Sequence, residues 1–128
     1  MNKFNRKFVR NKPLKETGTN GIEAQTKNYA KKKGCWVRKF SSPTQRGVPD
    51  DIFMTSSGFI FFIEFKSPNK KPTHKQELEI NKILNNKGIV IVVDNLRQPG
   101  VDLWQQDFPI PIRIWHDGFA AIDSMLLF

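Results

Sequence analysis

The strongest structural signal in this sequence is the stretch GVPDDIFMTSSGFIFFIEFK, which begins at Gly47. Two runs rich in β-forming residues, Asp50–Thr55 and Phe59–Lys66, flank a Ser-Ser-Gly loop, a pattern typical of a β-hairpin. With Gly58 in the left-handed conformation, such a loop places the last residue of the first run opposite the first residue of the second. The sequence therefore predicts two adjacent antiparallel strands in a defined register.

This register predicts a cluster of charged side chains at one end of the hairpin. Counting back from the loop puts Asp50 opposite Glu64, with β-carbons about 5 Å apart on one face. Lys66 follows Glu64 by two residues, so the alternation of the strand projects it from the same face. The neighbouring acid, Asp51, is expected on the opposite face with Phe53. We therefore choose Asp50 as the candidate metal ligand.

The cluster has a chemical use. Two close carboxylates repel each other, and burial makes both charges costly. A divalent cation removes both problems, and oxygen ligands suit Mg²⁺ or Mn²⁺. A lysine beside the ion can orient or deprotonate a water, as metal-assisted phosphodiester hydrolysis requires. On spacing alone, an ordinary cross-strand ion network of Asp50, Glu64 and Lys66 remains an alternative.

Four motifs lie in a fixed order along the chain: a glutamate on a predicted helix, a G-x-P-D strand, an E-x-K strand and a glutamine on a later helix. They are supplied by Glu23, Gly47-x-Pro49-Asp50, Glu64-x-Lys66 and Gln76. This order resembles the VRR-NUC (virus-type replication-repair nuclease) family of the PD-(D/E)XK nuclease superfamily. The similarity extends from about residue 21 to residue 94, and the four-part order is much more specific than E-x-K alone.

The resemblance implies an α/β fold and a set of catalytic roles. The fold is a single domain, residues 21–128, with a restriction-endonuclease-like αβββαβ core and a central mixed sheet flanked by helices. Asp50, Glu64 and the backbone carbonyl of Phe65 are expected to bind one or two Mg²⁺ or Mn²⁺ ions. Lys66 is expected to position and activate the attacking water.

Glu23 and Gln76 each have two candidate roles. They stand three residues after Asn20 and Thr73, and this spacing is that of a helix-capping box. The two helices are expected to extend to about residue 33 and about residue 86. The resemblance instead assigns both side chains to the active site, with Glu23 as a further candidate metal ligand.

The rest of the domain shows weaker patterns. Cys35–Phe40 and Ile89–Val93 are expected to be strands, the second parallel to its neighbour because a helix makes the connection. Val101–Asp107 is expected to be a short helix and Ile110–Trp115 a strand. The apolar segment Phe119–Phe128 is either a last core element or an association surface.

Charge is distributed unevenly along the chain. Residues 1–46 hold 13 Lys/Arg and 2 Asp/Glu, a balance of +11, whereas residues 47–128 hold 8 and 10, a balance of −2. A polyanion bound by the first half and cut by the second explains this asymmetry. Residues 1–20 are interpreted as a flexible basic arm, with a solvated tail as the alternative. The candidate contacts to nucleic acid are Lys3, Arg6, Lys7, Arg10, Lys12, Lys15, Lys27, Arg46, Lys70 and Lys71.

The remaining composition limits the setting. The single cysteine, Cys35, lies in an apolar run and is expected to be a buried, unreactive thiol in a reducing compartment. His74 and His116 lack the spacing of a zinc site or a catalytic pair. No apolar run approaches the length of a membrane span, so a soluble, cytoplasmic protein without membrane contact is expected.

These observations predict a metal-dependent DNA endonuclease. The resemblance points to the junction-resolving and repair members of the family, and hence to branched DNA and a phage or mobile-element source. Paired cuts in a four-way junction favour a homodimer, whose contact is expected at Met125–Phe128 and the Phe59–Ile63 region. Two alternatives stay open: a nicking, flap or restriction-type nuclease, and a nucleic-acid-binding module without catalysis.

Overall fold

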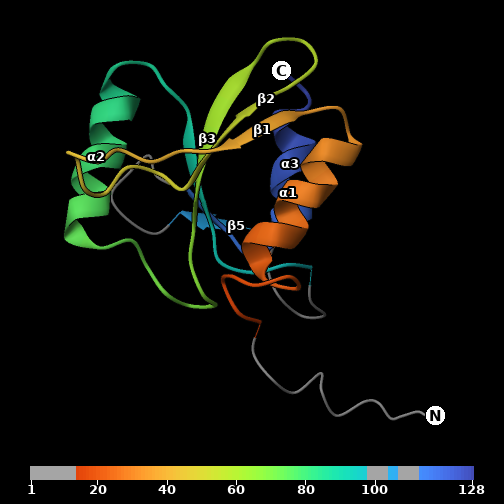
Figure 1. The fold of residues 1–128 in the computed structure, drawn as a ribbon, viewed down its shortest axis with the longest axis horizontal. Helices are drawn as coiled ribbons and strands as arrows, with labels where there is room; N and C mark the ends of the chain where they lie inside the picture. Colours follow the sequence, from red (N-terminus) through yellow and green to blue (C-terminus); the bar gives the residue numbers. More distant parts are fainter. Residues whose placement is uncertain (1–13, 98–103, 107–112) are drawn as a thin grey trace.

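The computed structural model describes residues 14–97, 104–106 and 113–128 (Figure 1). The helices in these residues are α1 (Ile22–Lys32), α2 (His74–Asn85) and α3 (Gly118–Met125). The strands are β1 (Trp36–Lys39), β2 (Asp51–Met54), β3 (Ile60–Phe65), β4 (Val90–Val93), β5 (Trp104–Gln106) and β6 (Arg113–Trp115). In this part of the chain, none of the helices has the length and apolar character needed to cross a membrane.

The six strands form one mixed sheet in the order β1-β2-β3-β4-β6-β5. β1, β2 and β3 are antiparallel neighbours, whereas β3, β4 and β6 run parallel. Helix α2 covers one face of the sheet, and α1 and α3 cover the other (Figure 1). The element order begins αβββαβ, which confirms the predicted α/β fold with a central mixed sheet.

Each sheet face has its own apolar core, and the alternation of the strands decides which residues it receives. Ile80 of α2 packs with Val90, Val92 and Ile114 on one face. The larger core, on the face of α1 and α3, consists of buried residues that include Ile22, Phe53, Phe61, Ile63, Phe65, Ile91, Val93, Ile122 and Met125. Burial on both faces explains why the middle strands read as continuous apolar runs.

The β2–β3 hairpin has the predicted register. Phe53 pairs with Phe61, and the Thr55 amide donates a hydrogen bond of 2.9 Å to the Phe59 carbonyl. Gly58 adopts φ +90°, so the loop uses the left-handed residue that the sequence predicted. The loop therefore sets the register by local geometry alone.

Helix α1 begins differently from the prediction. It starts after Gly21, with no side-chain cap, so the capping box of Asn20 and Glu23 is wrong. The amides of Ile22 and Glu23 instead donate hydrogen bonds of 2.8 and 3.0 Å to the carbonyls of Lys15 and Glu16. These two carbonyl groups take the place of a side-chain cap, so the Glu23 side chain can make other contacts.

The same hydrogen bonds change the extent of the predicted arm. Residues 14–20 fold back along the start of α1, and Leu14 packs against the larger core. Residues 14–20 therefore belong with the folded unit. Residues 1–13, with five of the predicted nucleic-acid contacts, lie outside the described residues.

The C-terminal region corrects one prediction and decides an alternative. Trp104–Gln106 is strand β5, paired with β6, so the short helix expected at Val101–Asp107 is wrong there. The rest of that segment lies outside the described residues. Phe119–Phe128 mostly forms α3, whose Ala121, Ile122 and Met125 are buried in the core, so the segment is a last core element up to Met125.

Candidate active site

Asp50 and Glu64 meet where β2 begins and β3 ends. The β2–β3 ladder ends with the pair of Asp51 and Ile63. The next position in the same register places Asp50 opposite Glu64. The amide of Phe65 donates a hydrogen bond of 2.7 Å to Asp50 Oδ2. Glu64 is almost completely buried, with 1% of its surface exposed. The structure thus brings together the two acids that the sequence analysis selected.

Gln76 joins Glu64 to Lys66. Its Nε2 donates a hydrogen bond of 2.6 Å to Glu64 Oε2, and its Oε1 accepts one of 3.3 Å from Lys66 Nζ. The same Oε1 accepts a hydrogen bond from the Thr73 amide, and Thr73 Oγ1 accepts one from the Gln76 amide. The capping box is therefore present. Gln76 can cap α2 and contact the active-site residues at the same time.

The alternation of the strands explains why α2 supplies this side chain. Phe61, Ile63 and Phe65 face α1 and α3, so Glu64 points to the opposite face, where α2 packs. On β2, Asp51 shares the face of Phe53, which leaves Asp50 on the α2 side. The candidate active site is consequently built at one end of the α2 face.

Gly47 explains the spacing of the G-x-P-D motif. It adopts φ +86°, a backbone conformation that favours glycine. A β-carbon at this position would lie 2.6 Å from the carbonyl oxygen of Lys75, in the first turn of α2. The glycine thus lets the chain pass closely over the helix that carries Gln76, three residues before Asp50.

Both central acids have raised pKa values in the absence of a cation. Burial, and then the charge of Asp50, raise the pKa of Glu64 to about 9, although Lys66 acts in the opposite direction. Burial also raises the pKa of Asp50, whereas the hydrogen bond from the Phe65 amide acts to lower it. These carboxylates therefore need a positive partner before both can ionise.

Glu23 lies beside the site, in a second charged group. Lys39 Nζ donates a hydrogen bond of 2.9 Å to Glu23 Oε2, and Lys27 Nζ lies 3.7 Å from the same atom. Burial opposes ionisation, but the neighbouring Asp51, the hydrogen bond from Lys39 and the charges of both lysines outweigh it and lower the pKa of Glu23. Glu23 is thus held as a carboxylate near Asp50, whose pKa it raises further.

Asp51 belongs to the α1 side of the sheet, as predicted. It is fully buried, and its Oδ1 lies 3.0 Å from Lys27 Nζ. Burial and the neighbouring Glu23 raise the pKa of Asp51 to about 7, with Lys27 opposing. Lys27 is therefore part of an internal ion pair, and its predicted contact with nucleic acid receives no support from the structure.

Glu16 is a residue that the sequence analysis missed. Burial and then the charge of Asp50 raise the pKa of Glu16, which in turn raises the pKa of Glu64. Its carbonyl holds the start of α1, so its position follows from the fold of residues 14–20. As the one acid among residues 1–20, it carried a sequence signal that the arm interpretation did not use.

The donor set fits a divalent cation of the Mg²⁺ or Mn²⁺ type. Within the described residues, no three Asp, Glu, His or Cys side chains form a metal-binding group. The predicted ligands include only two side chains, those of Asp50 and Glu64, together with the backbone carbonyl of Phe65. Glu64 Oε1 is buried and has no hydrogen-bond partner in the described part of the chain. An unpaired oxygen beside a second carboxylate is what a hard cation would satisfy.

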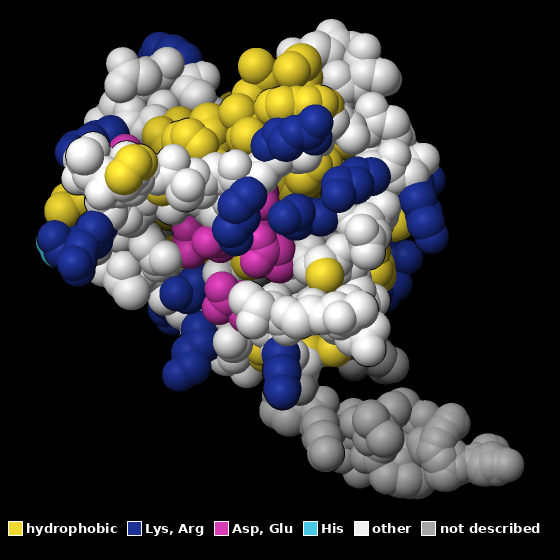
Figure 2. All heavy atoms as spheres, in the orientation of Figure 1, with side chains coloured by type: hydrophobic (Ala, Val, Ile, Leu, Met, Phe, Trp, Pro, Cys, Tyr) yellow, Lys and Arg dark blue, Asp and Glu magenta, His cyan; other side chains and the backbone are white. Residues whose placement is uncertain are grey.

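Basic side chains surround the acids on the surface. Figure 2 shows the acidic side chains gathered at the centre of one face, with Lys and Arg around them. Of the predicted nucleic-acid contacts, those exposed in the described residues are Lys15, Arg46, Lys70 and Lys71. The surface thus offers positive charge on the approach to the buried carboxylates.

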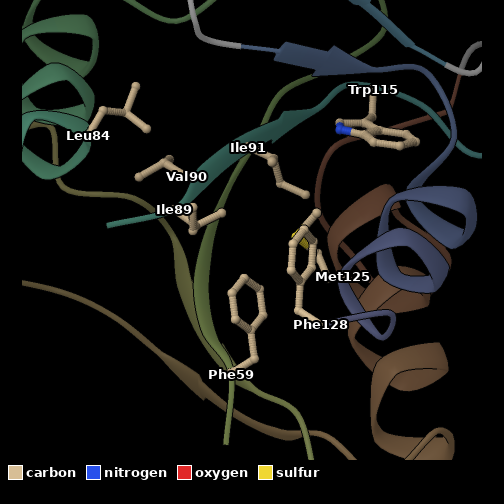
Figure 3. A pocket seen from close by; sticks show the side chains of 8 residues that line it. All are labelled: Phe59, Leu84, Ile89, Val90, Ile91, Trp115, Met125 and Phe128. Carbon is tan, nitrogen blue, oxygen red and sulfur yellow. The ribbon is translucent and has the colours of Figure 1, made fainter. Parts of the chain in front are cut away.

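Other features lie away from these acids. An apolar pocket of about 380 Å³ is lined by Phe59, Leu84, Ile89, Val90, Ile91, Trp115, Met125 and Phe128 (Figure 3). It lies near the start of β3 and β4, whereas the acids lie at the end of β3.

Cys35 is buried, as predicted, and burial raises the pKa of its thiol. His116 Nδ1 lies 2.5 Å from Asp94 Oδ1, and His74 is exposed.

Comparison with known proteins agrees with the fold. No protein-family model matches the chain. It is 38% identical over 74 residues to "Putative nuclease p44" of Acyrthosiphon pisum secondary endosymbiont phage 1, a match that covers 58% of this chain and 80% of the relative. A solved structure described as "VRR_NUC domain" superposes with a TM-score of 0.53 at 24% identity, covering 82% of this chain and 94% of that one. The chain belongs to the VRR-NUC nuclease family.

Proposed function

We propose that this nuclease is a Mg²⁺- or Mn²⁺-dependent DNA endonuclease that prefers branched substrates. The observation that carries the proposal is the linkage of the buried Glu64 to Lys66 through a single side chain, Gln76, beside the half-buried Asp50, which the Phe65 amide holds in place. Glu64 is buried beside a second carboxylate and a lysine, and it has an unpaired oxygen and a raised pKa. Such a group is expected where a cation binds during function.

The roles of the residues follow from their positions. Asp50, Glu64 and the Phe65 carbonyl would hold the metal ion, which supplies Lewis-acid stabilisation of the phosphate and a more acidic water. Lys66 orients the attacking water and takes part in holding its proton. Gln76 keeps the Lys66 Nζ and the Glu64 carboxylate in fixed relation, because it binds both.

The substrate class rests on charge and on the family. The basic half of the sequence and the exposed lysines around the site favour a polyanion. Preference for branched DNA is carried over from the resemblance to junction-resolving enzymes. Glu23 and Glu16 adjoin the site and complete its acidic rim, with Glu23 as the further candidate ligand.

Cleavage of a substrate panel tests the function directly. A four-way junction, a flap, a linear duplex and a single strand would be incubated with Mg²⁺, Mn²⁺ or EDTA. We expect metal-dependent cleavage, fastest on a branched substrate. Asp50→Asn and Glu64→Gln should abolish cleavage while DNA binding persists, since affinity comes mainly from basic groups.

The panel also separates the alternatives. Equal cleavage of linear duplex and junction would remove the branched-DNA preference and leave a nuclease of another substrate class. Binding without cleavage under every metal condition would favour a non-catalytic module. Near wild-type cleavage by Asp50→Asn or Glu64→Gln would show that the catalytic assignment is wrong.

We also propose that two copies associate through an apolar surface at the C-terminus. Leu127 is 87% exposed, Phe128 66% and Ile60 47%, an unusual exposure for large apolar side chains. The ring of Phe128 stacks on Phe59 with centroids 4.7 Å apart, so the tail covers the hairpin only in part. A dimer would bury this surface and provide the two active sites that paired cuts require.

Sedimentation at micromolar concentration tests the association. The wild-type chain should sediment as a dimer, and Leu127→Glu should shift it to the monomer. Ser124→Glu, at a half-buried polar position of the same helix, serves as the charge control. A monomeric wild type would overturn the dimer and leave the nuclease proposal standing.

A further inference from the structure

A groove opens beside the candidate active site. It has a volume of about 680 Å³ and lies between two chain segments that are distant in sequence. One wall consists of Leu14, Lys15, Glu16 and Thr17, and the other of Ser67, Pro68 and Lys70. The volume falls within the range of about 300–1,000 Å³ that binding clefts for organic groups usually have.

Both walls are tied to the elements that carry the catalytic residues. The carbonyls of Lys15 and Glu16 accept hydrogen bonds from the first amides of α1. In the other wall, the Lys70 amide donates to the Ser67 carbonyl at 3.0 Å, and Asn69 takes the left-handed φ of +66°. The groove is therefore formed before any ligand binds.

A buried aspartate, paired with a half-buried histidine, supports the second wall. The Asn69 amide donates a hydrogen bond of 3.2 Å to Asp94 Oδ2, while Asp94 Oδ1 lies against His116 Nδ1. Asp94 directly follows β4, which is the parallel neighbour of β3. The turn after Lys66 is thus fixed to the sheet edge where the catalytic strand ends.

The groove lies next to the candidate active site. Lys66 immediately precedes Ser67 in one wall, and Glu16 in the other wall lies close enough to Asp50 for their charges to interact. Lys15 and Lys70 are both exposed and stand on opposite walls. A ligand in the groove would therefore lie between two cationic side chains, with one end at the catalytic carboxylates.

We propose that this groove binds the sugar–phosphate backbone of the cleaved strand on one side of the scissile phosphate, with Lys15 and Lys70 each neutralising a phosphate. The proposal rests on the proposed nuclease function. A continuous strand suits the site because the groove is open to the surface and lies next to the residues assigned to cleavage. Glu16 marks the junction between the groove and the metal-binding acids.

Binding measured in EDTA tests the groove without cleavage. On duplex DNA, Lys15→Ala and Lys70→Ala should each lower the salt slope of log affinity by about 0.9, and the double variant by about twice as much. Lys31→Ala removes the same charge from an exposed position in the last turn of α1 and should leave the slope unchanged. Equal slopes in all variants and the wild type would overturn the proposal.

Substrates with one neutral methylphosphonate at successive positions locate the contact. The wild type should bind more weakly when the neutral linkage lies just to one side of the cut. The Lys15→Ala, Lys70→Ala double variant should lose this sensitivity at those positions alone. Unchanged sensitivity, or sensitivity on both sides of the cut, would contradict the assigned path.

Cleavage by the wild type separates this proposal from the one on which it rests. Metal-dependent cleavage with unaltered KM in the double lysine variant overturns the groove and retains the nuclease. A wild type that binds DNA through these lysines without cutting it overturns the nuclease and retains the groove. If the wild type neither binds nor cuts nucleic acid, both proposals fail.

Discussion

Gln76 Nε2 donates a hydrogen bond of 2.6 Å to Glu64 Oε2, across the interface between α2 and the sheet. Because its Oε1 also accepts from Lys66 Nζ, one amide sets the distance between the acid and the base of the site. The opposite ends of the amide are not interchangeable, since the carboxylate needs a donor and the ammonium an acceptor. The side chain is therefore suited to orienting both groups at once.

Replacing Gln76 should affect turnover more than stability. Gln76→Ala removes the contacts to Glu64 and Lys66, and supporting residues of metal sites usually contribute about 10–100-fold. Thr73→Ala is the matched control, because it weakens the cap of α2 at a cost of about 1 kcal/mol and leaves the amide of Gln76 in place. Steady-state kinetics with thermal melts would check this, and equal losses of activity in both variants would reduce Gln76 to a capping residue.

Lys66→Ala should lower kcat and leave metal affinity nearly unchanged. A cationic side chain next to the metal ion does not ligate it, but its loss removes the group that orients the water. The measurement is cleavage rate against Mn²⁺ concentration, which separates maximal turnover from the metal concentration at half-maximal rate. Wild-type turnover in this variant would remove the role that we assign to Lys66.

The metal-free protein should become less stable as pH rises. Glu64 has an ordinary pKa of 4.5, raised in the fold to about 9, so the folded state retains a proton that the unfolded state has lost between these values. Its stabilising contribution is complete below about pH 4.5 and is lost as pH rises towards 9. Unfolding free energies in EDTA across this range would check the direction.

Two further measurements identify the group that causes the pH dependence of stability. Glu64→Gln should flatten the fall in stability, because glutamine has no proton to lose. Mn²⁺ should stabilise the wild type more at high pH than at low pH, since the ligand must be deprotonated to bind the ion. A fall of equal size in Glu64→Gln would assign the effect to other groups.

Gly47→Ala should lower both stability and activity. The left-handed backbone costs a non-glycine residue about 1–3 kcal/mol, and the new methyl group also meets the Lys75 carbonyl. Gly58→Ala is the matched control, because Gly58 has φ +90° but open space around its β-carbon position. Denaturant unfolding should show the larger loss at Gly47, and only Gly47→Ala should reduce kcat in the folded fraction.

Removing residues 1–13 tests the basic arm. The deletion ends before Leu14, which packs against the core, and removes five basic side chains. If all five contact phosphates of duplex DNA, the salt slope of binding should fall by about 4.5. A flexible arm would give a fall of about two or three, and an unchanged slope would show a solvated tail.

Much of the site followed from local spacing. Asp50 and Glu64 share a face because the loop at Gly58 fixes the register and the strand repeats every two residues. The same rule placed Lys66 with Glu64, and Asp51 on the other side. Thr73 and Gln76 form their capping box because its parts lie within one helical turn. Such relationships involve residues close in sequence, so their geometry depends little on the rest of the fold.

The tertiary structure decided which segments distant in sequence come into contact. The start of α1 is satisfied by the carbonyls of residues 15 and 16, not by Asn20, because the burial of Leu14 brings that segment back along the helix. That fold places Glu16 beside Asp50, and the close approach at Gly47 brings α2 over the site. β5 pairs with β6 where local pattern favoured a helix. Packing between distant segments fixes these positions, and no local spacing in the chain encodes which surfaces will meet.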